Sequence, residues 1–388
     1  MLEAWLAGDL QEFTVDLDAL KPASAFVARV IRQNYPDLNV PLHARWRHFT
    51  LKGHDLWAEI ANKAQWANAQ ARARAQFDLA IVSVLLDAGA GPDWTYRDAA
   101  TGVTSSRSEG LAIASLRMFE AGVFSHDAND PLRADASKLS DFTAAQLAAG
   151  FQVSEKNPLA GLEGRAALLA RLGKTMAAAP DIFAMADNAR PGGLFDVLTR
   201  DAKGNVIAAP DILRALLLHL GPIWPGRIML DGLSLGDTWK HPAIKRTDAT
   251  NGLVPFHKLS QWLSYSLIEP LQEAGYTVGD VNGLTGLAEY RNGGLFVDAK
   301  VIALRDPAKA MQDNAVDSPL VVEWRALTIA LLDKIAPLVR AELGVDEQKF
   351  PLGCVLEGGT WTAGRVLARE KRADAGPPIR VVSDGTVF

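Results

Sequence analysis

Apolar residues recur at helical spacing in several parts of the chain. Within residues 23–35, Phe26, Val27, Val30 and Ile31 form the stripe of an amphipathic helix. The same kind of pattern predicts four further helices. They cover residues 110–120, 211–220, 255–274 and 320–343. The strongest periodic signals in the sequence are therefore helical.

The segment at 110–120 carries signals at both ends. Ser106 stands three residues before Glu109, which is the spacing of a capping box, and Gly122 is placed to end the helix. We therefore expect the Ser106 side chain to cap the first turn.

Signals for β-strands are weaker. Residues 295–297 and 301–304 look like a small hairpin, and 94–97 with 103–105 is a second candidate. A last strand is expected at 379–382. These short runs add little to a helical sequence.

The order of the elements indicates the fold class. Strands and helices do not alternate regularly, so a doubly wound parallel sheet is not indicated. We predict a mainly α-helical fold with small β-hairpin additions. The sequence offers no confident internal boundary, and we expect one large globular unit over residues 1–388.

The composition excludes some classes of protein. Of the 388 residues, 48% are apolar, which is enough to bury a core and excludes disorder as the main state. Forty basic residues against forty-five acidic ones give a net charge of −5. This balance offers no electrostatic footprint for nucleic acid, whereas a few local cations suffice for a small anionic substrate.

The single cysteine and the apolar runs bear on the cellular setting. Cys354 excludes internal disulfides, and its apolar neighbours predict a buried, inert thiol. No apolar run approaches the roughly 18 residues of a membrane span. The N-terminus lacks the basic start and apolar stretch of a secretory signal. We expect a cytoplasmic protein that has no membrane partner, and its oligomeric state stays open.

Three short motifs invite functional interpretations that their context does not support. The Gly89-Ala90-Gly91 turn would need its third dinucleotide-binding glycine at Trp94, so a helix end with a tight turn is favoured. Residues 232–236, Gly-Leu-Ser-Leu-Gly, have the spacing of a nucleophile elbow but precede a poor helix start, which favours a glycine-rich turn. The seven histidines lack zincin spacing, so no metal site is predicted.

The segment 255–274 carries the most informative pattern. At about 100° per residue, one arc of the predicted helix is apolar and the other is polar. The polar arc holds His257, Lys258, Gln261, Tyr265 and Glu269. The bland interpretation is a solvated face, but such faces usually repeat Lys, Glu and Arg. Five different hydrogen-bonding groups suit recognition of a compact polar ligand.

Two later segments add groups that fit a pocket. A glycine-flanked turn sets Glu289, Tyr290 and Arg291 in succession, and an ion pair between Glu289 and Arg291 is its structural alternative. Glu323 and Arg325 stand at the start of the helix predicted at 320–343, where capping is the bland interpretation. Composition and spacing therefore indicate a polar pocket and leave its chemistry open.

Several long blocks make the chain recognisable. It resembles the bacterial and fungal family linked to the URC (Urg) route of uracil catabolism, over nearly its whole length. The blocks that carry the resemblance are residues 85–92, 106–111, 161–165, 190–196, 221–227, 256–262 and 382–388.

A more distant resemblance concerns the queuosine-salvage N-glycosylases, which are relatives of the helical DNA glycosylases in fold. Their phenylalanine-x-lysine-x-x-glutamine helix motif is matched by residues 256–261, and their alanine-aspartate-tyrosine-arginine motif by residues 288–291. Their later glutamate-x-arginine is matched by residues 323–325. The acid of the second motif is longer here by one methylene, since Glu289 replaces aspartate, and asparagine-glycine-glycine follows it. The resemblance implies a DNA-glycosylase-like helical fold.

These two resemblances together imply a reaction. Uracil catabolism by this route is thought to pass through a ribosylurea-type intermediate, which must lose its sugar to release urea. The implied activity is hydrolysis of the N-glycosidic bond of ribosylurea or its 5′-phosphate. Glu289 would stabilise the positive charge on the anomeric carbon or activate water. His257, and after it Glu323, would protonate the leaving nitrogen.

The same resemblance implies how the substrate is held. Lys258 and Arg325 would bind phosphate or ribose hydroxyls, and Trp262 or Tyr290 would pack against the sugar or the ureido plane. The expected substrate-binding residues are Lys258, Gln261, Trp262, Tyr290, Arg291 and Arg325. No organic cofactor is implied. Two alternatives stay open, a non-catalytic binding or partner protein of the same pathway and an amidohydrolase that cuts the ureido group.

Overall fold

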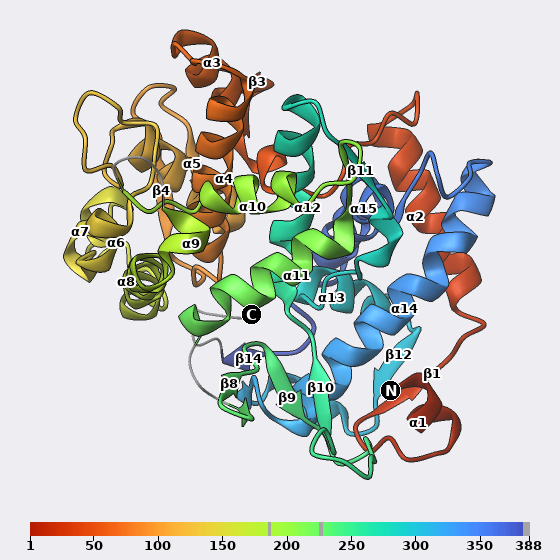
Figure 1. Ribbon diagram of the computed structural model, residues 1–388. Coiled ribbons are helices and arrows are strands. Elements are labelled where there is room, and N and C mark those ends of the chain that lie inside the picture. The colour runs from red at the N-terminus through yellow and green to blue at the C-terminus, as the bar shows by residue number, and fades with distance from the viewer. Residues whose placement is uncertain (185–187, 225–227, 383–388) are drawn as a thin grey trace.

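The computed structural model describes residues 1–184, 188–224 and 228–382. Residues 225–227 of the family block 221–227, and residues 383–388 of the block 382–388, therefore lie outside the described residues. Helices dominate it (Figure 1). The α-helices are α1 (Leu2–Leu6), α2 (Leu20–Asn34), α3 (Leu56–Lys63), α4 (Ala69–Leu85), α5 (Arg107–Glu120), α6 (Ala136–Ser140), α7 (Ala144–Gly150), α8 (Leu162–Ala178), α9 (Pro180–Phe183), α10 (Gly193–Arg200), α11 (Ala209–Leu220), α12 (Lys258–Glu273), α13 (Tyr290–Asp298), α14 (Pro319–Leu343), α15 (Leu352–Cys354) and α16 (Trp361–Lys371). Short 3-10 helices are η1 (Arg45–Phe49), η2 (Gly221–Ile223), η3 (Val281–Gly283) and η4 (Pro307–Met311), and η5 (Val355–Thr360) is a π-helix.

The strands are short and pair two by two. They are β1 (Phe13–Val15), β2 (Thr50–Leu51), β3 (His54–Asp55), β4 (Thr95–Arg97), β5 (Thr104–Ser106), β6 (Val206–Ala208), β7 (Met229–Leu230), β8 (Leu233–Ser234), β9 (Thr238–Lys240), β10 (Leu253–Pro255), β11 (Thr277–Gly279), β12 (Ile302–Leu304), β13 (Asn314–Ala315) and β14 (Val381–Val382). The pairs β1–β12, β2–β3, β4–β5, β7–β8 and β9–β10 are antiparallel, whereas β6–β11 and β13–β14 are parallel. The prediction of a mainly helical fold with small β additions is confirmed.

The predicted helices form, with one shifted start. The helix expected from Pro255 begins instead at Lys258, because Pro255 ends strand β10, where it pairs with Thr238. Helix α5 begins after Ser106 as expected, but within the described chain the Ser106 side chain makes no capping hydrogen bond. Glu109 pairs instead with Arg365 at 2.6 Å, so the capping box is absent.

Only some of the predicted strands form. The hairpin of β4 and β5 is confirmed. Within residues 232–236, Gly232 lies in the turn of the β7–β8 hairpin, and Leu233 and Ser234 form β8. The hairpin predicted at 295–304 is wrong, because residues 290–298 form helix α13. Strand β12 pairs instead with β1, near the other end of the chain. The strand expected at 379–382 is reduced to β14.

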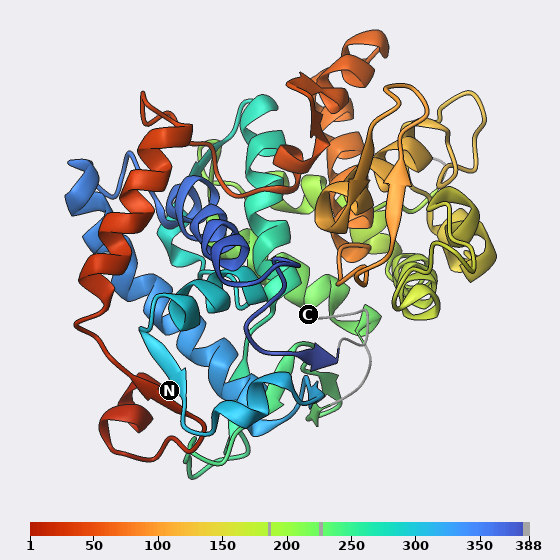
Figure 2. The ribbon, with the colours of Figure 1, turned by 180° about the vertical axis from the view of Figure 1, so that it is seen from behind.

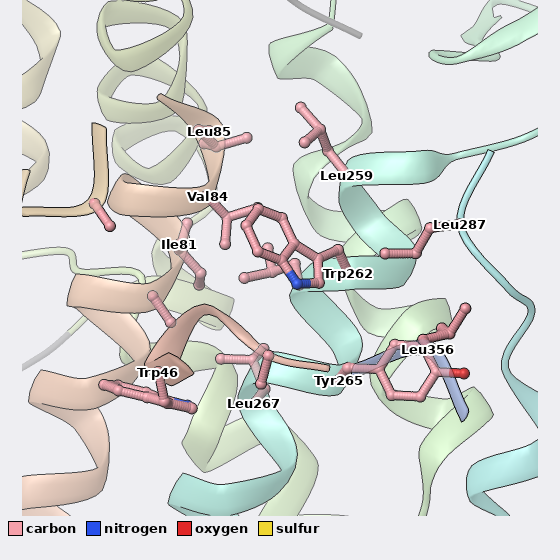
Figure 3. Packing of buried hydrophobic residues seen from close by; sticks show 14 of the residues in the cluster. Trp46, Ile81, Val84, Leu85, Leu259, Trp262, Tyr265, Leu267, Leu287 and Leu356 are labelled. Carbon is pink, nitrogen blue, oxygen red and sulfur yellow. The ribbon is translucent and has the colours of Figure 1, made fainter. Parts of the chain in front are cut away.

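Helix α12 runs through the core. It packs against α4 on one side and α11 on another, and both its predicted apolar arc and much of its polar arc are buried. Trp262 lies beside Val84 and Ile81 of α4, while Tyr265 lies next to Leu356 (Figure 3). The polar arc of this helix is therefore no solvated face, since Gln261 and Tyr265 are buried.

The C-terminal third packs around this core. Helix α14 lies along α2, and α13 packs against α16, so both ends of the sequence contribute to one region (Figures 1 and 2). The chain after α16 then crosses the face seen in Figure 2 to reach β14. This crossing segment covers part of the cavity described below.

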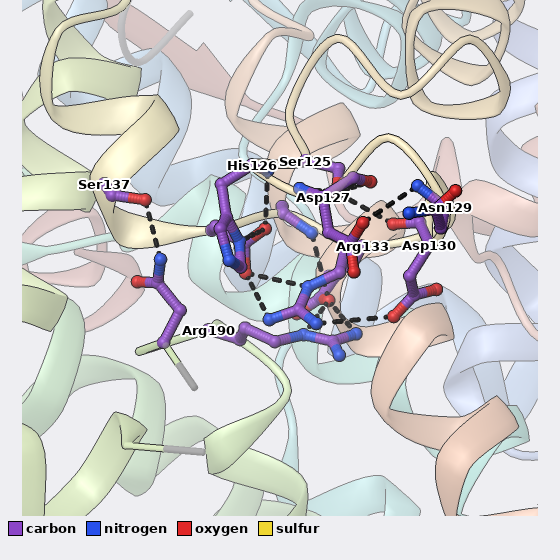
Figure 4. A network of polar contacts seen from close by, with 12 residues as sticks. Ser125, His126, Asp127, Asn129, Asp130, Arg133, Ser137 and Arg190 are labelled. Atoms are coloured by element: carbon purple, nitrogen blue, oxygen red, sulfur yellow. Dashed lines mark hydrogen bonds and ion pairs between the residues drawn. The ribbon is translucent and has the colours of Figure 1, made fainter. Parts of the chain in front are cut away.

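A buried polar network fastens the loop before α6 to α4 (Figure 4). Asp135, which is fully buried, accepts hydrogen bonds from Arg133 Nε and from the backbone and ring of His126. Asp78 on α4 accepts from Arg190 Nε at 2.8 Å and from the backbone N–H of Ala134 at 3.2 Å. Burial raises the pKa of Asp78 against the opposing effect of Arg190. The network serves the fold and lies apart from the cavity lining.

Two further expectations concern burial. Cys354 is buried, its Sγ lies 3.1 Å from the carbonyl of Val40, and burial raises the pKa of its thiol to about 12. The expected inert thiol is therefore found. Among the described residues, every helix is too short or too polar to cross a bilayer.

Candidate functional site

A cavity of about 420 Å³ opens between the core helices and the crossing C-terminal segment. This volume lies within the range of small-molecule sites. Helices α12, α13 and α16 contribute walls, as do the turn after α4 and the start of α5. The charged and aromatic lining residues are His43, His48, Asp87, Arg107, Glu109, Lys258, Trp262, Glu289, Tyr290, Arg291, Trp361, Arg365 and Asp374.

Glu289 occupies the N-cap of α13 and lines the cavity. Its two carboxylate oxygens accept the backbone N–H groups of Arg291 and Asn292, each at 2.6 Å. Burial raises the pKa of Glu289 above its ordinary value, although these N–H groups and Lys258 favour the ionised form. The result is a carboxylate in fixed orientation that is more basic than an exposed one. The Glu289 carboxylate therefore bonds to the backbone of Arg291, and not to its guanidinium as the structural alternative would have it.

Lys258 begins α12 and lines the same cavity. Burial lowers the pKa of Lys258, while the nearby carboxylates of Asp87 and Glu289 oppose that shift. Its Nζ lies 5.5 Å from the centre of the Trp262 ring, which is a cation–π distance. The ammonium therefore stands within electrostatic reach of both carboxylates, above an aromatic wall.

Histidines and tryptophans form one wall of the cavity. The ring of His43 stacks on that of Trp262 at 5.9 Å, and the ring of His48 meets Trp262 edge-on at 5.4 Å. Trp361 lies 5.6 Å from His43 and 5.8 Å from His48. Such a wall suits a planar or sugar-like ligand.

His43 has a carboxylate partner. Its Nδ1 lies 2.5 Å from Oε2 of Glu357, and both side chains are largely buried. Glu357 lies in the π-helix η5, and such bulges are frequent at functional sites. The carboxylate fixes the ring and favours a proton on Nδ1, so Nε2 is available for chemistry. The sequence analysis missed this pair because its members are 314 residues apart.

His48 is a buried imidazole in the same wall. Burial, aided by Arg45, lowers the pKa of His48 from 6.5 to about 4, so the ring is neutral at neutral pH. Its Nδ1 has no hydrogen-bond partner among the described residues. A buried polar atom left this way is rare in folded proteins and is frequent at ligand sites.

Asp87 anchors the turn after α4. Its Oδ1 accepts from Arg45 Nη1 at 2.7 Å, and its Oδ2 accepts from the Ser108 hydroxyl at 3.1 Å. The glycine-rich turn that follows, residues 89–91, also lines the cavity. The turn after this helix therefore contributes to the site without any dinucleotide fingerprint.

Trp262, Tyr290 and Arg291 line the cavity, as expected from the family motifs. The Arg291 guanidinium lies 4.9 Å from the centre of the Tyr290 ring, and its Nη1 donates to the carbonyl of Ala375 at 2.8 Å. Burial raises the pKa of Tyr290, so its hydroxyl is a neutral donor.

Gln261 and His257 lie outside the cavity lining. Gln261 is buried, and its Oε1 accepts the backbone N–H of Thr285 at 3.1 Å. His257 adopts a left-handed backbone with φ of 49° and lies beside Asp237 and Ser260 instead. The helical period predicts that both side chains lie on the same face as Lys258. For His257 this fails because the backbone turns there, before the helix begins at Lys258.

Arg325 and Glu323 are also held away from the lining. Arg325 forms a bidentate pair with Asp237, both N···O distances being 2.8 Å, and its Nε donates to the carbonyl of Ala288 at 3.3 Å. Glu323 is fully buried and accepts the backbone N–H of Phe13 at 2.8 Å. Both side chains fix the scaffold around the site.

The junction at Asp237 links the family motifs. Although burial alone would raise it, Arg325 holds the pKa of Asp237 below its ordinary value. Asp237 Oδ2 also accepts the backbone N–H of Lys258 at 3.0 Å. Since Arg325 also holds Ala288, one ion pair positions both Lys258 and the residue before Glu289.

The residues that the structure describes contain no cluster of three His, Cys, Asp or Glu side chains arranged to hold a metal ion. The charged and imidazole groups of the described cavity lining are instead four carboxylates, one ammonium, two imidazoles and three guanidinium groups.

Comparison with known proteins places the chain. Residues 1–388 match the family described as protein of unknown function (DUF1688). The chain is 39% identical over 415 residues to uracil catabolism protein 4 of Lachancea kluyveri, covering 98% of this chain and 93% of that protein. It is 39% identical over 388 residues to protein urg3 of Schizosaccharomyces pombe (strain 972 / ATCC 24843), covering 98% and 92%. The resemblance to the URC (Urg) family is thereby confirmed, and the chain belongs to the DUF1688 family.

Proposed function

We propose that this protein acts in uracil catabolism and hydrolyses the N-glycosidic bond of ribosylurea or its 5′-phosphate. The name of one relative, uracil catabolism protein 4, supports a role in this pathway. The observation that carries the reaction is Glu289, a carboxylate fixed by two backbone N–H groups and opening on a ligand-sized cavity beside Lys258.

The chemistry needs a negative charge at the sugar. As the bond from the anomeric carbon to the urea nitrogen breaks, its electron pair moves to nitrogen and positive charge develops on the sugar. Glu289 stabilises that charge or takes a proton from the attacking water. Its orientation is set before the substrate arrives, so little reorganisation accompanies the reaction.

The leaving nitrogen needs a proton or a hydrogen-bond donor. We assign this role to His43 in place of His257 and Glu323, because His43 lines the cavity and the Glu357 carboxylate holds its ring in place. The bond from the anomeric carbon to the urea nitrogen breaks as the protonated His43 ring gives the proton on Nε2 to that nitrogen. The oxygen of water then bonds to the anomeric carbon, and Glu289 takes the proton that this water releases. The products are urea and the free sugar, or its phosphate.

The remaining lining fits such a substrate. Trp262 and Trp361 offer flat apolar surfaces for the sugar ring or the ureido plane. Lys258 is placed to donate to sugar hydroxyls. We expect no organic cofactor in this scheme.

Product analysis tests the proposal. Purified protein is incubated with synthetic ribosylurea and with its 5′-phosphate, and urea, ammonia and reducing sugar are measured over time. Intact urea in equal amount to free sugar supports N-glycosidic hydrolysis. Ammonia and carbon dioxide would indicate an amidohydrolase instead, and tight binding without turnover would indicate a binding protein.

A further inference from the structure

We propose that an arginine-lined outer cavity holds the phosphate group of a phosphorylated substrate. This inference rests on the proposed function and names its substrate class. It makes ribosylurea 5′-phosphate, and not free ribosylurea, the preferred substrate of the site. The argument starts from a second cavity that adjoins the first.

The outer cavity has a volume of about 470 Å³. It shares Pro92, Arg107, Glu109, Arg291 and Arg365 with the lining of the inner cavity, so the two adjoin. Beyond these it is lined by polar groups of β5 and α16 and by one small residue. They are Thr104, Ser105, Ser106, Arg369 and Ala375.

Positive charge is in excess there. Four guanidinium groups line the outer cavity, whereas Glu109 is the carboxylate of its described lining. Glu109 pairs with Arg365 at 2.6 Å and neutralises one of the four. Arg107 donates to the carbonyl of Asp374 and Arg291 to that of Ala375, and these neutral carbonyls bring no negative charge to either guanidinium. In a protein of net charge −5, such a cluster needs an explanation.

Arg369 shows the excess most clearly. It is exposed on the last turn of α16 and makes no hydrogen bond or ion pair to a described residue. Its side chain lines the same cavity as three other arginines, and positive charges gathered in this way favour the binding of an anion. Arginine also matches the geometry of phosphate oxygens better than other cations do.

A helix terminus points to the same ligand. Strand β5 leads into α5, a helix of 14 residues, and Ser106 at its N-cap makes no side-chain capping bond within the described chain. Backbone N–H groups at a helix start attract phosphate. The hydroxyls of Ser105 and Ser106, which line this cavity, add further donors.

The placement of Arg291 connects the two cavities. It lies two residues after Glu289 and lines both the inner and the outer space. A sugar whose anomeric carbon faces Glu289 can therefore extend its phosphate toward Arg291 and the outer arginines. Lys258, on the inner side, is then left to the sugar and the leaving group.

Calorimetry on the full-length protein tests the site without requiring turnover. The probes are ribose 5-phosphate, ribose and inorganic phosphate. The variants are Arg369→Gln and, as a matched control, Lys371→Gln, which removes the same charge from the same helix outside the cavity lining. We expect ribose 5-phosphate to bind at least about tenfold more tightly than ribose, the usual scale of one charged hydrogen bond. Arg369→Gln should lose most of that advantage, and Lys371→Gln almost none.

The outcomes separate this inference from the proposed function. Equal affinity for ribose and ribose 5-phosphate, or equal losses in both variants, would overturn the phosphate site. If free ribosylurea and its phosphate are hydrolysed with equal kcat/KM, the inference fails while the proposed reaction stands. If neither is hydrolysed but Arg369 still governs ribose 5-phosphate binding, the phosphate site stands and the reaction fails. An acidic peptide that displaces ribose 5-phosphate more effectively than inorganic phosphate would also overturn it.

Discussion

Replacing Glu289 by glutamine separates the chemistry of the site from its folding. The substitution keeps the size of the side chain and removes its charge. Two backbone N–H groups, those of Arg291 and Asn292, point at the carboxylate oxygens from 2.6 Å. Glutamine has one oxygen, so one N–H loses its acceptor, which costs about 1 kcal/mol.

The burial of Glu289 acts in the opposite direction. Because its pKa in the folded protein is raised above that of an exposed glutamate, ionised Glu289 destabilises the fold as pH rises past its ordinary value of 4.5. A neutral glutamine removes that cost. The two effects oppose each other, and we expect the free energy of unfolding at pH 7 to change by no more than about 1 kcal/mol.

Turnover should respond far more strongly. Loss of a group that stabilises developing charge or acts as base lowers the rate by roughly 10²–10⁴-fold. Substrate binding should change much less, because the charge develops only in the transition state. The assay is single-turnover release of urea from ribosylurea 5′-phosphate, with binding measured by calorimetry and stability by denaturant unfolding.

A matched control uses another capping carboxylate. Asp55 caps α3 by accepting the backbone N–H of Ala58 at 2.9 Å, outside the cavity lining. Asp55→Asn makes the same carboxylate-to-amide change and should leave turnover intact. If Glu289→Gln keeps turnover within about threefold of the original protein, far less than the loss of a catalytic group causes, the assignment of Glu289 is refuted.

Three further predictions follow from other contacts. Glu357→Gln should lower turnover by roughly 10²-fold, because the ring of His43 loses the carboxylate that orients it; turnover within about threefold of the original protein would show that the pair is structural. His48, whose pKa is lowered to about 4, supports the fold fully above pH 6.5 and loses that support as pH falls to 4; His48→Gln should flatten the acid loss of stability by about 3 kcal/mol, measured by urea unfolding at several pH values. Arg325→Met strands the buried Asp237 carboxylate and should cost about 3–5 kcal/mol of unfolding free energy, with partial recovery when Asp237→Asn is added; an additive double variant would contradict the pairing.

Most of the long helices can be predicted from the periodic spacing of their apolar residues. Helices such as α2 and α14 have an apolar stripe of their own, and such a stripe needs no knowledge of distant residues. Helix α13 was missed because its short apolar run before Ile302 also fits a strand, and the cap supplied by Glu289 was not recognised as a helix start. The pairing of β1 with β12 joins residues nearly 290 apart, which no local pattern reveals.

The sequence predicts only part of the site, because only part of it consists of residues that are neighbours in the sequence. Lys258, Trp262, Glu289, Tyr290 and Arg291 came from compact motifs whose members are neighbours in the sequence and line the cavity. The remaining wall is assembled from segments that meet only on folding, such as η1 and the start of α16. A lone histidine or glutamate in such a segment carries no spacing signal.

Gln261 and Arg325 show what a family motif encodes besides ligand contacts. Both residues match the family motifs, yet each makes its hydrogen bonds to the backbone or to another buried side chain. Asp237, which belongs to none of the matched motifs, ties Arg325 to the first turn of α12. A fixed ion pair at this junction sets the distance between Lys258 and Glu289, because it holds the backbone next to each. Positioning of this kind is as necessary as the ligand contacts themselves, since small displacements of reacting groups cost large factors in rate.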